Sequence, residues 1–174
     1  MRKLFATFLF VALSQGLGIA AEGTSARQAA KPPQSAPGVN VSDNEAAAIG
    51  RIRTLNTAEV TYAATYKVGF TDGLNRLGAP PSGKKPDKDN AFFVDEELAG
   101  RSKGGTNTSF ERKGYKFTYK PGAADSKGNI GAYTIVVRPI QFGKTGKRSF
   151  FSDQTGKIHA TSDDREPTAK DPPL

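Results

Sequence analysis

Apolar residues recur at a helical spacing between Ser42 and Tyr66. The stripe consists of Ala48, Ile52, Leu55, Tyr62 and Tyr66, widened by Ile49, Val60 and Ala63. Steps of three, four and seven residues bring such side chains to one face of an α-helix. Three charged residues lie off this face: Arg51, Arg53 and Glu59. The pattern predicts one long amphipathic helix whose core residues include Ile49, Ile52, Leu55, Val60 and Tyr62.

Local signals set the ends of this helix. Ser42, with Glu45 three residues later, has the pattern of a capping box, so the helix is expected to begin there. Gly69 is expected to stop it. Two shorter helical segments are predicted next, a single turn at 71–78 and a short helix at 91–99.

Further along the chain the period changes to two, which is typical of half-buried strands. Strands are predicted at 115–120, 132–138, 149–152 and 157–160, with a turn at 153–156. Short connections favour antiparallel neighbours. A helix with one apolar stripe needs an apolar sheet face to cover it. We therefore expect an α+β fold in which one long N-terminal amphipathic helix packs on a four-stranded antiparallel sheet.

The first residues of the chain have the pattern of a secretory leader. Met1-Arg2-Lys3 is basic, LFATFLFVAL is apolar, and small residues follow at Gly18, Ala20 and Ala21. We expect a signal peptide at 1–21, cleaved after Ala20 or Ala21, and export to the periplasm or the cell exterior. The alternative is an uncleaved leader that anchors the protein in the inner membrane, the one case in which membrane contact is expected.

Composition divides the rest of the chain into three parts. Residues 22–41 are rich in Ala, Pro, Ser and Gly and predict a disordered linker. Residues 42–160 form the folded domain. Residues 161–174, TSDDREPTAKDPPL, have the same character as the linker and predict a disordered tail.

The charge and the rare residues exclude some functions. The formal net charge is +8, and removal of a leader that contains Arg2 and Lys3 leaves about +6 (8 − 2). A positive balance favours polyanions or anionic surfaces, although the cations are mixed with acids along the chain. The chain has no cysteine, so a thiol nucleophile, a disulfide and a Cys metal site are excluded; its one histidine, His159, argues against a His-based zinc site. His159 is expected on an exposed edge strand.

Several phrases in the folded part resemble the globular part of type IV pilins and type II secretion pseudopilins. They are NEAAAI at 44–49, RTLNTAEVTY at 53–62, GYKFTY at 114–119, AYTI at 132–135 and FFSDQTGKI at 150–158. Pilins carry an apolar helix that continues into the amphipathic one. Here the apolar run lies before the expected cleavage site, and Pro32, Pro33 and Pro37 separate it from the helix. The resemblance implies a pilin-like head released from its assembly stalk, not a pilus subunit.

Aromatic residues alternate with cations in the predicted strands. Such interleaving can bind nucleic acid by stacking and phosphate contact, and the candidate contacts to a polyanion are Lys116, Lys120, Lys147 and Arg148. The simpler interpretation, which we favour, is a sheet with aromatics inward and lysines outward.

Three other motifs are weak. Residues 78–85 match part of a phosphate loop, but Pro80 and Pro81 remove two N–H donors. Residues 125–129 resemble a calcium loop in which Lys127 occupies a ligand position. Residues 95–97 are adjacent acids, which are more typical of a solvated face than of a catalytic pair. The sequence therefore predicts no catalytic residue, cofactor or metal.

These observations predict an exported, non-catalytic, pilin-like protein that acts by surface interaction. The expected partners are an envelope protein or components of a pilus or type II secretion apparatus, with loops 79–110 and 121–131 carrying recognition. No small-molecule substrate is identified. The alternative is a basic module that binds nucleic acid or an anionic envelope polymer weakly. A periplasmic hydrolase ranks lowest, because no general base with a partner can be named.

Overall fold

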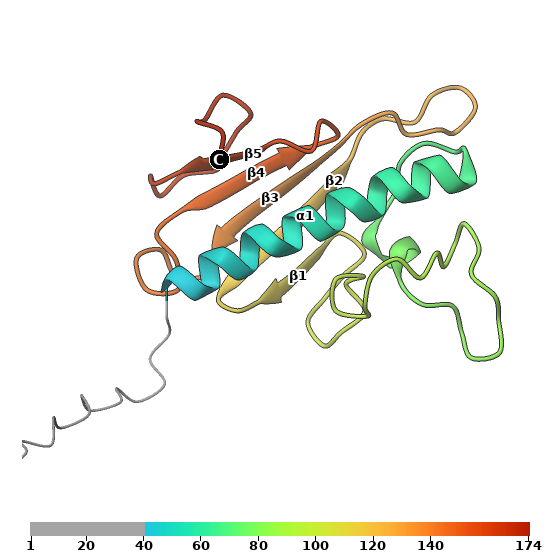
Figure 1. Cartoon of the computed structure of the whole chain (residues 1–174), viewed down its shortest axis with the longest axis horizontal. Helices are drawn as coiled ribbons and strands as arrows, with labels where there is room; N and C mark the ends of the chain where they lie inside the picture. The colour runs from blue at the N-terminus through green and yellow to red at the C-terminus, as the bar shows by residue number, and fades with distance from the viewer. Residues whose placement is uncertain (1–40) are drawn as a thin grey trace, which may run out of the picture. The chain divides into compact units, whose positions relative to one another are not determined.

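A computed structural model describes residues 41–174 as one long helix packed on an antiparallel sheet (Figure 1). The fold is α+β, as the sequence predicts. The predicted signal peptide and, apart from Val41, the predicted linker lie outside the described residues. The helix is the first element of the described part rather than the N-terminus of the chain.

Helix α1 (Val41–Tyr66) buries one side, but that side differs in part from the predicted stripe. Ala48, Ile52, Leu55 and Tyr62 are buried as expected. Val60, expected in the core, is 55% exposed, whereas Glu59, expected off the stripe, is 0% exposed. At 3.6 residues per turn, Glu59 lies only ~40° around the helix from Leu55 and Val60 lies ~140° away. The position of each residue around the helix axis, rather than its type, therefore determines which of the two is buried. The prediction was wrong for Val60 and Glu59 because it followed residue type.

Glu45, the acidic residue of the predicted capping box, makes a long-range contact. Glu45 accepts hydrogen bonds from the backbone N–H of Lys147 (2.9 Å) and from Nε of Arg148 (2.8 Å). The helix is assigned from Val41, so Ser42 lies within its first turn. Glu45 therefore fastens the start of α1 to the segment that leads into the fourth strand of the sheet.

The sheet has five strands, one more than predicted. They are β1 (Ser109–Arg112), β2 (Tyr115–Pro121), β3 (Tyr133–Pro139), β4 (Ser149–Asp153) and β5 (Ile158–Thr161). Each pairs antiparallel with the next, in the order β1-β2-β3-β4-β5. The four predicted strands are confirmed. Strand β1 escaped prediction because it is four residues long and buries only Phe110.

Residues between α1 and β1 form a long connection. Its one helical piece is the 3₁₀ helix η1 (Leu74–Leu77), within the predicted turn. The helix predicted at 91–99 is absent from this part of the chain, which turns instead. Phe92 has φ 59°, outside the right-handed helical region, so a regular helix cannot pass through it.

The sheet has two faces of different chemistry. Along β2, Tyr115, Phe117 and Tyr119 point to the buried side, and Lys116 and Lys120 point to the other. Helix α1 lies across the aromatic side (Figure 1). We call this the inner face and the lysine-bearing side the outer face.

The end of the chain is ordered, contrary to the predicted disordered tail. Ala160 N–H donates to Pro172 O (2.9 Å), and Leu174 N–H donates to Ile158 O (2.9 Å), so residues 172–174 pair along β5. His159 is therefore not on a free edge, and its Nδ1 lies 2.6 Å from Asp171 O. The polar composition of this segment did not reveal these backbone contacts.

Candidate binding surface

The four cations singled out in the sequence do not form one surface. Lys116 and Lys120 lie on the outer face, four residues apart along β2. Arg148 reaches the inner side, where it bonds Glu45 of α1 and lies 5.5 Å from the centre of the Phe150 ring. Lys147 is exposed beside it. The structure thus separates Lys147 and Arg148 from the two lysines of β2.

A third cation completes the outer-face group. Arg138 of β3 stands directly opposite Lys116 in the antiparallel register. With Thr118, Lys120, Val136 and Glu166, these two residues line a hollow of ≈ 220 Å³, which we call the basic trough. Sequence reasoning missed Arg138, although it lies two residues after Val136 on the same face of a predicted strand.

The C-terminal segment forms one wall of the trough. Asp164 pairs with Arg138 (2.7 Å), and Glu166 pairs with Lys120 (3.4 Å). No ion pair joins Lys116 to a carboxylate anywhere in residues 41–174. The floor residue Val136 is only 9% exposed, and Pro167 of the segment is also buried.

The segment is closed on itself. Arg165 forms an ion pair with Asp171, and Thr168 N–H donates to Asp171 Oδ2 (2.7 Å). These contacts lower the pKa of Asp171 to about 2. We call residues 162–171 the tail flap, because β5 precedes it and residues 172–174 pair with β5 after it.

The strongest cluster of polar groups on the inner face is sealed. Glu59 accepts from Thr71 N–H (3.0 Å) and Thr71 Oγ1 (2.6 Å), and Tyr119 Oη donates to Thr71 O (2.8 Å). Burial raises the pKa of Glu59, and it raises the pKa of Tyr119 above its usual range. None of the three residues is more than 1% exposed. A shifted carboxyl can mark a reactive site, but here it joins the helix to the sheet out of reach of a substrate.

A second group of buried polar side chains joins the middle of α1 to the sheet. Asn56 Oδ1 accepts from Tyr133 Oη (3.0 Å), and Asn56 Nδ2 donates to Ser152 Oγ (2.8 Å). Ser152 Oγ in turn donates to Lys157 O (2.8 Å). Each polar atom has a partner, as buried polar groups require.

In two of the weak motifs, polar groups form hydrogen bonds within their own loop. Asp125 Oδ1 accepts from the backbone N–H groups of Lys127 and Asn129 (2.8 Å each), which lowers the pKa of Asp125. Residues 78–85 contain a turn closed by Lys84 N–H and Pro81 O (3.0 Å). Within residues 41–174, no group of three or more acidic or histidine side chains is placed to hold a metal ion.

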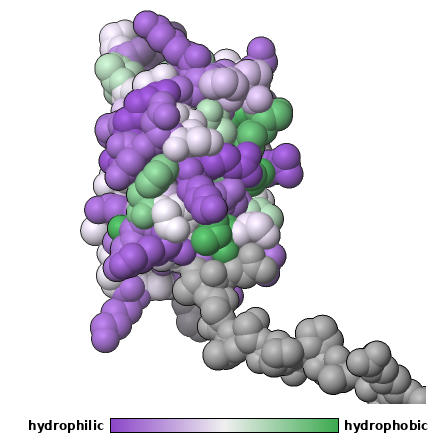
Figure 2. Space-filling view, turned by 90° about the vertical axis from the view of Figure 1, so that its left-hand side faces the viewer, coloured by the Kyte–Doolittle hydropathy of each residue, from purple (hydrophilic) through white to green (hydrophobic). Residues whose placement is uncertain are grey.

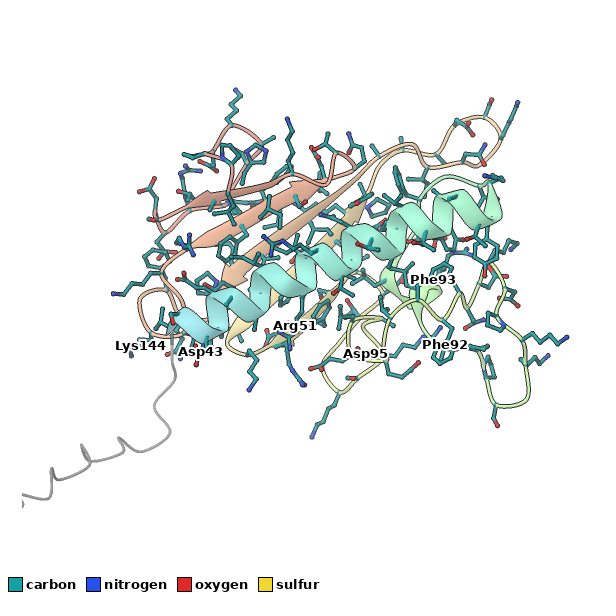
Figure 3. The ribbon with its side chains drawn as sticks, in the orientation of Figure 1. Asp43, Arg51, Phe92, Phe93, Asp95 and Lys144 are labelled. Carbon is teal, nitrogen blue, oxygen red and sulfur yellow. The ribbon has the colours of Figure 1, made fainter. Side chains whose placement is uncertain are left out.

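The acids at 95–97 also have structural partners. Asp95 Oδ1 accepts from Leu98 N–H (2.8 Å), Glu96 pairs with Arg101 (3.4 Å), and Glu97 pairs with Arg112. Figure 3 shows Asp95 with Phe92 and Phe93 on the long connection beside α1. Phe92 is 63% exposed, so this connection displays a single large apolar side chain.

The surface around the start of α1 is mostly hydrophilic. Figure 2 shows separate hydrophobic patches among polar residues on that side of the molecule. No helix in the described part of the chain is both long enough and apolar enough to cross a membrane. Polar recognition suits this side better than burial of an apolar partner surface.

The chain matches no family model, no curated protein and no solved structure.

Proposed function

We propose that this protein is an exported, non-catalytic, pilin-like domain that acts by binding an envelope protein through its surface. The partner would be a component of a pilus or a type II secretion apparatus. After cleavage of the signal peptide the protein would reside in the periplasm or outside the cell. A leader left in place would instead tether it to the inner membrane.

One observation carries this proposal: the sheet uses its two faces for different purposes. The inner face is filled by aromatic rings and by α1, and its polar groups bond one another. The outer face carries cations and, within residues 41–174, is covered by the tail flap. A scaffold face opposite an open charged face is suited to recognition, because rigid elements can hold recognition side chains in place.

Polyanion binding is the second candidate. It is favoured by the three cations Lys116, Lys120 and Arg138, which share one face of the sheet, and by the net charge of +8. The flap carboxylates beside two of these cations weaken it, because they would repel phosphates. Binding of this kind would fall steeply with added salt.

The binding role is tested with the full chain in its native envelope. Mass spectrometry of the purified protein identifies the mature N-terminus, which is expected after Ala20 or Ala21. Affinity purification from cross-linked envelopes should recover one defined protein in constant proportion. Recovery of the bait alone, with the protein free in the periplasm, would contradict the proposal.

A further inference from the structure

We infer that the basic trough is a recognition site for an extended acidic segment of a partner protein, and that the tail flap occupies this site in cis. The inference deepens the proposed binding role and rests on it. It names the chemistry of the ligand, which is a peptide with closely spaced carboxylates, and the chain's own competitor for it.

The register of the sheet supplies the first argument. Lys116 and Arg138 face each other directly across β2 and β3. Like charges in this position destabilise an antiparallel pair. Carboxylates from outside the two strands offset this repulsion: Glu111 of β1 stands opposite Lys116, and Asp164 of the tail flap pairs with Arg138.

The flap shows what such a ligand looks like. Asp164 contacts Arg138, and Glu166 contacts Lys120, which lies farther along β2. The segment therefore runs along the strand with two carboxylates separated by one residue. Pro167 follows and is buried. A partner segment of the form acid-x-acid-proline would reproduce these contacts.

The flap contacts are also exchangeable. Arg138 and Asp164 have 41% and 60% of their side chains exposed, and Lys120 and Glu166 have 59% each. Exposed ion pairs contribute little and weaken with salt. The flap is fastened elsewhere, through Arg165 and Asp171 and through the pairing of residues 172–174 with β5. Its acids can leave the trough while its closure and its pairing with β5 remain intact.

One cation is left for a ligand that the flap does not fully imitate. Lys116 lines the same hollow and forms no ion pair among residues 41–174, although Glu111 of β1 stands opposite it in the register. A partner with a third carboxylate could engage it. Such a carboxylate would distinguish an external ligand from the flap, whose acids pair with Lys120 and Arg138 only.

Fluorescence anisotropy on the full chain tests the inference. The probe is a labelled peptide of residues 161–170, TSDDREPTAK, at low salt. The flap variant Asp164→Asn/Glu166→Gln should bind it about threefold to tenfold more tightly than the wild type, because two weak competing contacts are removed. The same peptide with Asp164→Asn and Glu166→Gln should bind neither protein.

Matched variants separate the trough from general charge. In the flap-variant background, Lys116→Gln/Lys120→Gln/Arg138→Gln should abolish peptide binding. The control variant Lys84→Gln/Lys85→Gln/Lys144→Gln removes the same charge from exposed loops and should leave peptide binding unchanged. Asp43→Asn/Glu96→Gln raises net charge as the flap variant does and should leave the wild-type affinity unchanged. Circular dichroism confirms that each variant is folded.

Three results would overturn the inference. They are equal peptide affinity of wild type and flap variant, equal loss with both triple variants, and tighter binding of single-stranded DNA than of peptide to the flap variant. The last result would assign the trough to polyanions. If the peptide fails while the full chain still co-purifies with an envelope protein, the acidic-segment inference is wrong and the binding role stands.

Discussion

The two faces of the sheet are covered in different ways. The inner face is covered by α1 through fully buried side chains, and its polar groups are hydrogen-bonded within the core. The outer face is covered by the tail flap, whose acids contact it through exposed ion pairs and whose Pro167 is buried. Buried contacts persist in salt, and exposed ones do not. The contacts of the flap acids with the outer face are therefore more easily exchanged than the contacts of α1 with the inner face.

This difference separates stability from recognition. Changes on the inner face should alter the free energy of unfolding and leave binding specificity alone. Changes on the outer face should alter binding and leave the free energy of unfolding almost unchanged. The predictions below run from the largest effect on stability to the smallest.

The largest effect is expected from a cavity beneath α1. Ile52 is 0% exposed, so Ile52→Ala should lower the free energy of unfolding by about 2–5 kcal/mol. Val60→Ala is the matched control on the same helix and should change it by less than about 0.5 kcal/mol, because Val60 is 55% exposed. Urea denaturation measures both. A larger loss for Val60→Ala would mean that α1 packs through another side.

The next effect concerns the polar bridge between α1 and the sheet. Asn56→Leu leaves Tyr133 Oη and Ser152 Oγ each without one buried partner. Such a loss costs about 1–3 kcal/mol. Thr57→Leu, one residue away on an exposed position, is the control. An unchanged urea midpoint for Asn56→Leu would show that this bridge does not stabilise the fold.

The two faces should also respond to pH in opposite directions. Burial raises the pKa of Glu59 above its ordinary 4.5, so the folded state holds this proton more strongly than the unfolded state. Its contribution to stability is complete below 4.5 and is lost as pH rises through the folded pKa. The pKa of Asp171 is lowered from 3.8 to about 2, so its contribution is present above 3.8 and is lost as pH falls toward 2.

Urea denaturation at pH 7, 5 and 3 tests this opposition. In the wild type the free energy of unfolding should include a gain from Glu59 as pH falls through its raised folded pKa toward 4.5. Glu59→Gln removes that gain while keeping the side-chain shape. Asp171→Asn should instead reduce the loss of unfolding free energy that occurs as pH falls below 3.8. Identical pH profiles for wild type and Glu59→Gln would refute the assignment of Glu59.

The smallest effect on stability is expected in the trough. Arg138→Gln removes the ion pair with Asp164, which should change the free energy of unfolding by about 0.2–1 kcal/mol at low salt. The difference from wild type should vanish in about 1 M salt, where screening extends over only ~3 Å. A salt-independent loss above this range would mean that the flap is part of the core.

The sequence predicted the parts of the fold that depend on local period. Strands β2, β3, β4 and β5 and most of α1 followed from alternation and helical spacing. The burial of Glu59 in place of Val60 could have been predicted from helix geometry alone, since 3.6 residues per turn fix which residues lie on the same side of the helix as Leu55. The prediction placed Val60 in the core because it is apolar and did not weigh its position around the helix.

The remaining features depend on contacts that are distant in sequence. Strand β1 is defined by pairing with β2 rather than by its own four residues. The tail gains order from backbone bonds to β5, which its polar composition does not disclose. The trough needed the register that sets Lys116 opposite Arg138, and no reading of either strand alone provides a register. Arg148 was misplaced because its partner Glu45 lies about a hundred residues earlier.

The most direct test of the division between the faces is photo-crosslinking in intact cells. A crosslinking amino acid is placed at Thr118, on the floor of the trough, or at Thr54, on the exposed side of α1. A discrete adduct with one partner protein at Thr118, strengthened by Asp164→Asn/Glu166→Gln and absent at Thr54, is the predicted result. Adducts at Thr54 alone would place recognition on the helix and contradict the assignment of the outer face.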